Sequence, residues 1–283
     1  MKPRVAFLLL LPAIVCFGLA FVGPIGYVGR LSLFSTDFVS ESWVGLRNYW
    51  EAVTDPPFIR SFVNAGVYVV LIAGTVTLAG YWLAGVLVDL DRRLRSSLLF
   101  AFYAPTLASG LIAAMMWKWM LARAGLVNWL IGLVGIPPVG WFGVGWAARL
   151  AVSLTIVFAG LGGYVLIYTA NMLSVPREVR EQAAIDGAGP RQIRRYIVRP
   201  LMIPVVMLVS LLAVMSAAQV WETVLWLTSG GPGGRTSSPV FDTYLTAFVY
   251  GKHGLGAAKA VIVMAAIAAL SVTKRRVEKW IAG

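Results

Sequence analysis

The chain has 283 residues, of which 59% are apolar and only 13% are charged, and its mean hydropathy is +0.80. Soluble proteins carry about 25% charged residues, so this composition excludes a soluble class and indicates a protein that crosses a membrane several times. The net charge of +12 must therefore be read by position, because the loops in which the Lys and Arg residues lie indicate which side is cytoplasmic. A single cysteine, Cys16, and a single histidine, His253, exclude an intrachain disulfide framework and a Cys/His metal cluster.

Long uncharged stretches predict the membrane spans, because a helix needs about 20 mostly apolar residues to cross the hydrocarbon. Five stretches stand out, and a sixth, residues 254–273, is long enough although it carries Lys259 near its start. We expect the long side chain of Lys259 to reach the lipid head groups. The sequence thus predicts an all-α membrane protein with six transmembrane helices. Their expected ranges are 5–29, 61–88, 96–117, 150–176, 200–227 and 254–273.

Residues 124–148 are also uncharged, but they contain Pro137 and Pro138 beside several glycines, which argues against an unbroken helix. We interpret this stretch as a loop at the membrane interface. With six spans and both termini cytoplasmic, the inner segments hold 15 of the 24 basic residues, as the positive-inside rule requires. A seventh span would move the six arginines of residues 177–199 to the outside.

We expect a single transmembrane domain over residues 1–283. Residues 1–60 would form the first span and an outer loop, and residues 61–275, approximately, the core of the domain. Within this core, a cytoplasmic loop at residues 175–204 has the pattern of two helices joined by a turn. Asp186-Gly187 supplies the break between them.

The two helices of the cytoplasmic loop begin at prolines. Pro176 stands where the first helix can start, and Glu178 and Glu181 favour its first turns because they complement the helix dipole. The second helix follows Pro190 and is amphipathic and rich in arginine. From the residues alone two interpretations stay open: a basic helix pair lying on anionic lipid, or a segment that docks onto another protein.

The same stretch resembles the EAA loop in permease subunits of binding-protein-dependent ABC importers. That pattern is roughly Glu-Ala-Ala, three residues, Gly, about nine residues, then a hydrophobic residue, any residue, Leu and Pro. The chain matches it with Glu181, Gln182 and Ala183, with Asp186-Gly187, and with Pro200 at the end. Gln182 replaces the first alanine, and Arg199 replaces the usual leucine.

Other parts of the chain are similar to the carbohydrate-uptake subgroup of these permeases, which includes the maltose and glycerol-3-phosphate permeases. Trp221-Glu222 followed by LWLTSGGPGGRT looks like the signature after the fifth span of that subgroup. Residues 43–53, WVGLRNYWEAV, and residues 244–258 also fit. The resemblance covers nearly the whole chain, in register.

The resemblance implies the type I permease fold of ABC importers, in a bacterial or archaeal cytoplasmic membrane. It implies a complex with a second, homologous permease subunit (a heterodimer), two ATPase subunits and an extracytoplasmic solute-binding protein, surrounded by membrane lipid and without nucleic acid. Residues 181–187 would form a coupling helix that docks into an ATPase subunit. ATP and Mg²⁺ would bind to the ATPase subunits, with no cofactor in this chain.

The glycine-rich stretch SGGPGGRTSS does not have the order GxxxxGK[ST] of a phosphate-binding loop, and the expected topology places it outside the membrane. We therefore expect a Gly/Pro turn that shapes the outer gate. No nucleophile and base, and no paired carboxylates, occur within the predicted spans, so the sequence argues against an intramembrane enzyme and for a transport subunit without catalytic residues.

Glu222 is the ionisable exception inside the spans, and two interpretations of it stay open. Its carboxylate either reaches the outer interface or faces the sugar in a water-filled cavity. Ser216 and Gln219 would share its helix face at spacings of three residues. Tyr164 and Gly160, on the fourth span, lie at a depth that resembles the sugar-contacting region of related permeases. The glycines there, at 160, 162 and 163, also suit close helix packing.

The main alternative to a permease subunit is a secondary transporter or channel for a small polar solute. Secondary transporters often carry several ionisable groups inside the bundle for ion coupling, whereas this chain has essentially one, Glu222. His253 is expected to be a solvated residue of the last outer loop.

Overall fold

The computed structural model describes residues 3–36 and 40–282 of the chain. Over these residues the chain is mainly helical, with one short antiparallel hairpin in which Phe34 lies opposite Trp43. The chain divides into two compact units. One consists of residues 1–59 and 242–269, and the other of residues 60–241 and 270–283.

The first unit begins with a long helix that confirms the first predicted span. α1 (Pro3–Phe17), a π-helical turn (Gly18–Val22) and α2 (Gly23–Leu31) follow one another without a break. The portion Leu10–Leu31 is long and apolar enough to cross a membrane.

A buried amide connects the hairpin of the first unit to the helix that follows it. The hairpin consists of β1 (Phe34–Thr36) and β2 (Glu41–Trp43), and α3 (Arg47–Thr54) comes next. Asn48 Nδ2 donates to the backbone oxygens of Ser32 and Phe34, at 2.9 and 2.8 Å. Because a buried amide requires hydrogen-bond partners, these bonds fix α3 against the start of the hairpin.

The last predicted span is also a helix in the structure. α14 (Pro239–Tyr244) and a π-helical turn (Leu245–Val249) precede α15 (His253–Ala282), and His253–Thr273 is long and apolar enough to span a membrane. At Gly254 a Cβ atom would lie only 1.9 Å from the backbone oxygen of Phe34, so a residue without a side chain is needed where α15 begins.

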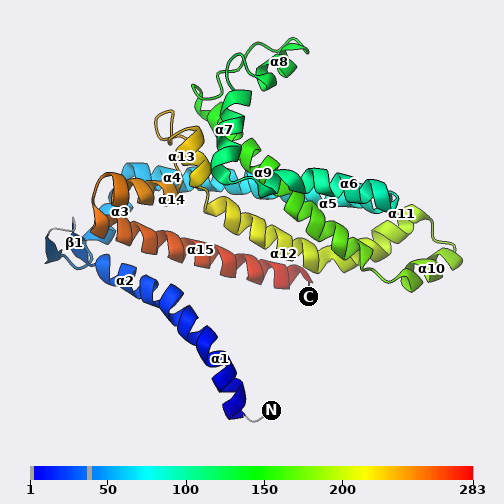
Figure 1. Ribbon diagram of the computed structural model, residues 1–283, viewed down its shortest axis with the longest axis horizontal. Helices are drawn as coiled ribbons and strands as arrows, with labels where there is room; N and C mark the ends of the chain where they lie inside the picture. The colour runs from blue at the N-terminus through cyan, green and yellow to red at the C-terminus, as the bar shows by residue number, and fades with distance from the viewer. Residues whose placement is uncertain (1–2, 37–39, 283) are drawn as a thin grey trace. The chain divides into compact units, whose positions relative to one another are not determined.

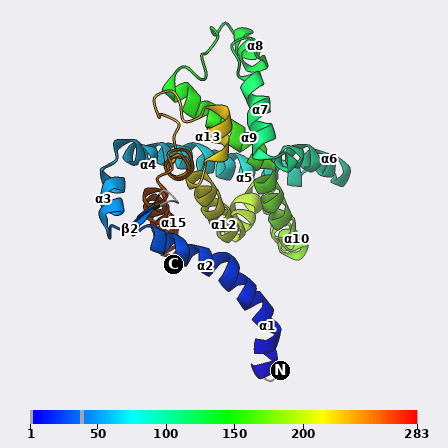
Figure 2. The ribbon, with the colours of Figure 1, turned by 60° about the vertical axis from the view of Figure 1, so that its left-hand side comes forward.

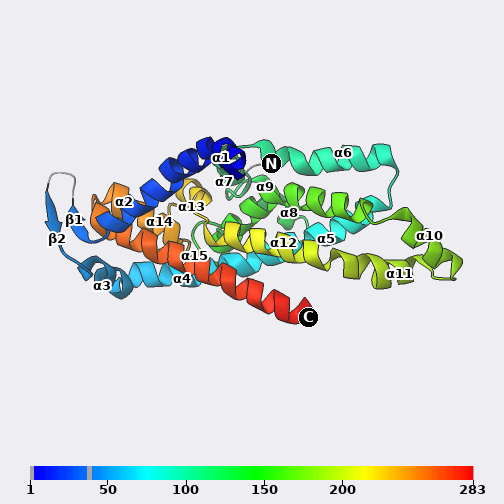
Figure 3. The same cartoon turned by 90° about the horizontal axis from the view of Figure 1, so that it is seen from below.

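Three long helices lie side by side in the second unit (Figure 1; Figure 3). Each is long and apolar enough to cross a membrane, which confirms the second, fourth and fifth predicted spans in position. Their shared core consists of Ala84, Tyr168, Met172, Met202 and Val209. The helices are α4 (Pro56–Tyr68) continued by Val69–Ala73 and α5 (Gly74–Val88), α9 (Gly145–Leu173), and α11 (Pro190–Ile193) continued by Arg194–Val198 and α12 (Arg199–Ala218).

The third predicted span, expected to be continuous, is broken. α6 (Arg92–Tyr103) passes into a 3₁₀ turn (Ala104–Leu107), and α7 (Gly110–Met120) then leaves at an angle of 99° (Figure 2). Ser109 has an extended backbone, and its Oγ accepts a hydrogen bond from the N–H of Ile112, so it caps a new helix instead of continuing the old one. Among the described residues there are five candidate spans, or six if this bent pair counts as one.

Two further expectations concern breaks. Residues 124–148 contain the short helix α8 (Leu126–Gly132) and a loop, which confirms that no unbroken helix spans them. The fifth span, however, was expected to continue to Leu227, and this was wrong. α12 ends at Ala218, and after Trp221, with φ −147°, a separate helix α13 (Glu222–Leu227) begins.

Candidate functional site

The predicted coupling segment has the helix, turn and helix that its sequence indicated. α10 (Arg177–Ile185) follows Pro176. Its end is closed by two backbone bonds, from the N–H of Gly187 to the oxygen of Ala184 at 3.1 Å and from the N–H of Ala188 to the oxygen of Ala183 at 2.9 Å. Gly187 has φ +87°, the left-handed conformation that favours glycine at a helix end. The expected break at Asp186-Gly187 is therefore confirmed.

Two polar contacts join this segment to the long helices of the second unit. Arg180 donates from Nη2 to the backbone oxygen of Met172, near the end of α9. Arg194, after the turn, forms an ion pair with Asp89, which follows α5. These contacts connect α10 to α9, and the helix that starts at Pro190 to the end of α5.

The surface of α10 is open to a partner. Glu181, Gln182 and Asp186 are exposed, and Ala183 is half-buried. The apolar side chain of Ile185 is 79% exposed on the same helix. The predicted coupling residues are therefore accessible, and their contact with an ATPase subunit stays a prediction.

The structure brings together three of the predicted substrate-pathway residues. The hydroxyl of Tyr164 on α9 is hydrogen-bonded to the side chain of Ser216 on α12. A Cβ atom on Gly160 would lie 3.8 Å from Cε2 of Tyr164, so this ring lies next to Gly160. At Gly162 a Cβ would come within 2.0 Å of the backbone oxygen of Phe102, which confirms close helix packing as the role of that glycine.

The helix break separates Glu222 from this group, and Gln219 lies at the end of α12 where the break begins. Gln219 follows the end of α12, and its Nε2 donates to the backbone oxygen of Met215 at 3.0 Å. Glu222 begins α13 and is half-buried. The helix face that was expected to carry Ser216, Gln219 and Glu222 together therefore ends before Glu222. Its carboxylate instead lies against Gly110, where a Cβ would be 2.6 Å from Glu222 Oε2.

The contact between Glu222 and Gly110 has an electrostatic basis. Gly110 is the first residue of α7, and the N-terminus of a helix carries a partial positive charge. A carboxylate at this position is stabilised without a cationic side chain. The bend in the third span and the break in the fifth therefore meet at one half-buried carboxylate, which sequence spacing did not reveal.

A polar clamp that the sequence analysis missed holds the glycine-rich loop, residues 228–238, in the second unit. Asn64 Nδ2, Arg149 Nε and Tyr68 Oη donate to backbone oxygens within residues 234–237, at distances of 2.7 to 3.0 Å. Arg149 Nη2 also donates to Asn64 Oδ1 at 2.7 Å. The expected turn is confirmed, since Gly230, Gly233 and Gly234 all have positive φ. The signal for the clamp was a polar amide, Asn64, in an otherwise apolar span.

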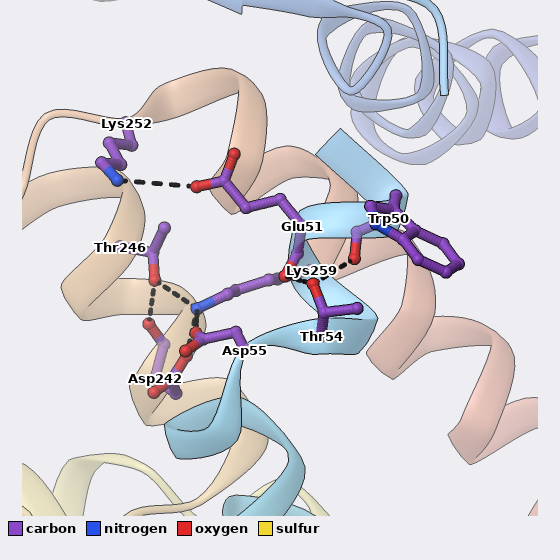
Figure 4. A network of polar contacts seen from close by, with 8 residues as sticks. All are labelled: Trp50, Glu51, Thr54, Asp55, Asp242, Thr246, Lys252 and Lys259. Carbon is purple, nitrogen blue, oxygen red and sulfur yellow. Dashed lines mark hydrogen bonds and ion pairs between the residues drawn. The ribbon is translucent and has the colours of Figure 1, made fainter. Parts of the chain in front are cut away.

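Lys259 is the centre of a buried charge cluster in the first unit (Figure 4). Its Nζ donates to Asp242 Oδ1 at 2.6 Å, to Asp55 Oδ2 at 2.7 Å and to Thr246 Oγ1 at 2.9 Å. The ammonium also lies 5.0 Å from the ring centroid of the buried Phe58. Two carboxylates compensate one ammonium, and every donor direction of the ammonium is used.

Two expectations about the last span and the loop before it were wrong, one for Lys259 and one for His253. Lys259 does not reach out to the head groups, because the residue is only 2% exposed. The burial of an ammonium is possible here because Asp55 and Asp242 compensate its charge. His253 is likewise not a solvated loop residue. It is 9% exposed, begins α15, and places its ring 6.4 Å from that of Phe248.

Comparison with known proteins identifies related chains. Residues 56–283 match the family described as "Binding-protein-dependent transport system inner membrane component". The trehalose/maltose transport system permease protein MalF of Thermococcus litoralis is 28% identical over 289 aligned positions, which cover 99% of this chain and 95% of the relative. The sn-glycerol-3-phosphate transport system permease protein UgpA of Pectobacterium atrosepticum is 27% identical, with 95% and 92% covered.

The fold is similar to that of a solved transporter chain. A chain in the crystal structure of the bacterial alginate ABC transporter, in complex with an alginate pentasaccharide-bound periplasmic protein, superposes with a TM-score of 0.84. The match covers 99% of this chain and 96% of the other, at 17% sequence identity. At this level of identity the likeness concerns the fold, and it confirms the expected all-α permease fold of an ABC importer.

Proposed function

The chain belongs to the family of binding-protein-dependent transport system inner membrane components, and we propose that it is the permease subunit of an ATP-driven importer for a sugar, a polyol or a sugar phosphate. The observation that carries the proposal is the family match over residues 56–283. The cargo class is supported by relatives named for trehalose/maltose and glycerol-3-phosphate transport, which align with nearly the whole chain. In this function the chain forms half of the translocation pathway.

The partners follow from the same family. A second, homologous permease completes the pathway, two ATPase subunits bind ATP and Mg²⁺, and an extracytoplasmic binding protein delivers the solute. Hydrolysis belongs to the ATPase subunits, and this chain supplies transport without a nucleotide site of its own. The exposed surface of α10, with Glu181, Gln182 and Ile185, supports a protein contact on the cytoplasmic side.

The mechanism couples nucleotide-driven closure of the ATPase subunits to the spans. When these subunits close, α10 moves with them, and the Arg180–Met172 and Arg194–Asp89 contacts pull on α9 and α5. Packed helices have discrete arrangements, so such a displacement switches the pathway between outward-facing and inward-facing states instead of deforming it gradually. ATP binding favours one of the two states through its differential affinity.

The solute passes the residues that line the middle of the pathway, among which we include Tyr164, Ser216, Gly160, Gln219 and Glu222. Hydroxyl, amide and carboxylate groups offer hydrogen bonds in place of the water that a sugar loses. A flat glycine surface at Gly160 beside the Tyr164 ring is suited to an apolar sugar face. The half-buried Glu222 offers a charged acceptor at the helix break.

Replacing Glu222 with glutamine is expected to weaken the apparent affinity for the solute five- to thirtyfold. Hydrogen bonds to a charged acceptor are about 1 to 2 kcal/mol stronger than those to a neutral one. The measurement is the solute concentration at half-maximal uptake in proteoliposomes. Basal ATPase activity should change much less, because α10 lies in a different part of the chain. A Glu51→Gln variant is the matched control for the removal of a carboxylate charge. If Glu222→Gln leaves the uptake kinetics unchanged, the role of Glu222 is limited to stabilising α7.

The proposed topology places both termini and residues 175–204 in the cytoplasm and residues 34–60 outside. Single cysteines in a Cys16→Ser background test it. A membrane-impermeant thiol reagent added to intact cells should label Ser42→Cys, which is exposed, and should leave Gly189→Cys unlabelled until the cells are opened. Labelling of Gly189→Cys in intact cells would show that the orientation is the reverse of the one proposed.

The function itself is tested with the purified complex. A thermal-shift screen of the cognate binding protein against sugars, polyols and sugar phosphates identifies the cargo, because a bound ligand stabilises the native state. Uptake of that solute into proteoliposomes should then require ATP in the compartment of the ATPase subunits and should require the binding protein. Uptake driven by an ion gradient without ATP would instead support a secondary transporter.

A further inference from the structure

Four arginines surround one cavity of the second unit. Arg191, Arg194, Arg195 and Arg199, on the continuous helix that begins at Pro190, line a cavity of about 610 Å³ together with Pro190 and Tyr81 of α5. All four arginines are exposed, and Tyr81 is half-buried. The cavity is thus an accessible basic pocket between two long helices. Its lining includes Arg194, which also forms the contact with Asp89, but none of the predicted substrate-pathway residues.

Among the described residues, most of the positive charge of this pocket has no compensating carboxylate. Arg194 is paired with Asp89. In the part of the chain that the structure describes, Arg191, Arg195 and Arg199 have no carboxylate within ion-pair distance. The guanidinium of Arg195 lies over the ring of Tyr196, at 5.5 Å from its centroid. Three guanidinium groups without a carboxylate partner among the described residues line one cavity, and they favour a ligand with clustered anionic oxygens, such as a phosphate.

The basic pocket continues into an apolar groove. A second cavity of about 340 Å³ shares Tyr81 and Arg199 with the first, and its other walls are mostly apolar. These walls include Leu78, which is 75% exposed, and Ile203, which is 45% exposed. From Arg199 to Met207, at the far end of the groove, the helix rises about 12 Å. Groove and pocket together match a ligand with an anionic head and an apolar chain at least this long.

We propose that this pocket and groove bind an anionic membrane phospholipid, with its phosphate among Arg191, Arg195 and Arg199 and one acyl chain along Leu78, Ile203 and Met207. A free phosphate ion would use the arginines but not the groove, and a neutral lipid would use the groove but not the arginines. Helices α5 and α12 belong to candidate membrane spans, so membrane phospholipids surround the protein at this depth. A lipid seated there would hold the helix after α10 to α5, beside the Arg194–Asp89 pair.

Native mass spectrometry of the complete importer tests the head-group part of the proposal. The complex is titrated in detergent with phosphatidylglycerol and, in parallel, with phosphatidylcholine of the same chains. Arg195→Gln with Arg199→Gln should weaken phosphatidylglycerol binding about 25-fold, since each arginine near an anionic lipid contributes about fivefold. The matched control, Arg92→Gln with Arg93→Gln, removes two exposed arginines outside the pocket and should change binding less than twofold.

Binding experiments on the wild-type complex distinguish a lipid from a free phosphate ion, and they do not depend on the variants. Inorganic phosphate at millimolar concentration should not displace long-chain phosphatidylglycerol, and the dihexanoyl form should bind more weakly because it fills less of the groove. Displacement by phosphate, or equal retention of phosphatidylglycerol and phosphatidylcholine, would overturn the proposal. Loss of the ATPase subunits from the Arg195/Arg199 variant with unchanged lipid binding would also overturn it, by assigning the arginines to a protein interface.

Discussion

A Lys259→Met variant is expected to lose about 3 kcal/mol of unfolding free energy, because it removes the cation from a buried cluster and leaves its anions. In the native chain, Lys259 Nζ lies within 2.7 Å of both Asp55 and Asp242. The side chain of Lys259 is 3% exposed, against 11% for Asp242 and 26% for Asp55. Without the ammonium the two carboxylates repel each other where water cannot fully solvate them.

The neighbouring pair in Figure 4 supplies the control. Lys252 and Glu51 are 3.6 Å apart, with side chains 62% and 48% exposed, so Lys252→Met should cost less than about 1 kcal/mol. Reversible denaturant titration in detergent micelles measures both variants. Adding Asp55→Asn and Asp242→Asn to Lys259→Met should recover most of the loss, since the uncompensated anions are then gone. Equal stability of the Lys259 and Lys252 single variants would contradict the structural role of the cluster.

The second large effect is expected on transport: Gly187→Pro should lower uptake and binding-protein-stimulated ATPase activity together. Gly187 has φ +87°, whereas proline requires a φ of about −65°, and its N–H donates to the oxygen of Ala184. Proline at this position therefore opens the end of α10 and redirects the chain into the second helix. A change in coupling of about 1 to 2 kcal/mol corresponds to a five- to thirtyfold loss.

Two further variants test whether the loss of uptake in Gly187→Pro comes from lost coupling at α10. Glu181→Lys keeps the turn and reverses an exposed charge on α10, so it should also reduce coupling if this surface binds the ATPase subunit. Gly189→Ala is the matched control, because Gly189 has φ −71° and a Cβ there would meet nothing closer than 3.7 Å. This variant should transport normally. Normal stimulated ATPase activity in Gly187→Pro and Glu181→Lys, at equal membrane insertion, would remove α10 from the coupling mechanism.

Local signals correctly predicted the helix, turn and helix of the segment to which we assign coupling. Pro176 before the helix, glycine at its end and Pro190 at the next start are backbone preferences that act within a few residues, and the structure has a turn with those boundaries. The break in the third span had a similar local signal, Pro105 followed by Ser109-Gly110, but uninterrupted hydrophobicity hid it. Hydrophobicity reports the length of a membrane segment and not whether one helix forms it.

Long-range partners account for the errors and omissions. Lys259 was expected to reach lipid, and the carboxylates that allow it to be buried lie 17 and 204 residues away in the sequence. The clamp on the glycine-rich loop joins Asn64 to backbone oxygens at least 170 residues away. Of the five substrate-pathway candidates, the structure groups Gly160, Tyr164 and Ser216. Gly160 and Tyr164 are one turn apart on α9, and the packing of α12 against α9 adds Ser216.

The sequence by itself determined the membrane class, the approximate positions of the spans, the coupling motif and the family. These are properties of segments, since each membrane helix satisfies its own backbone hydrogen bonds and must be apolar along its whole length. Only the tertiary structure decided which polar side chains are buried together, where Glu222 lies and how the Arg191–Arg199 pocket meets an apolar groove. Such contacts depend on which helices face each other, and that choice is made by packing among segments far apart in the chain.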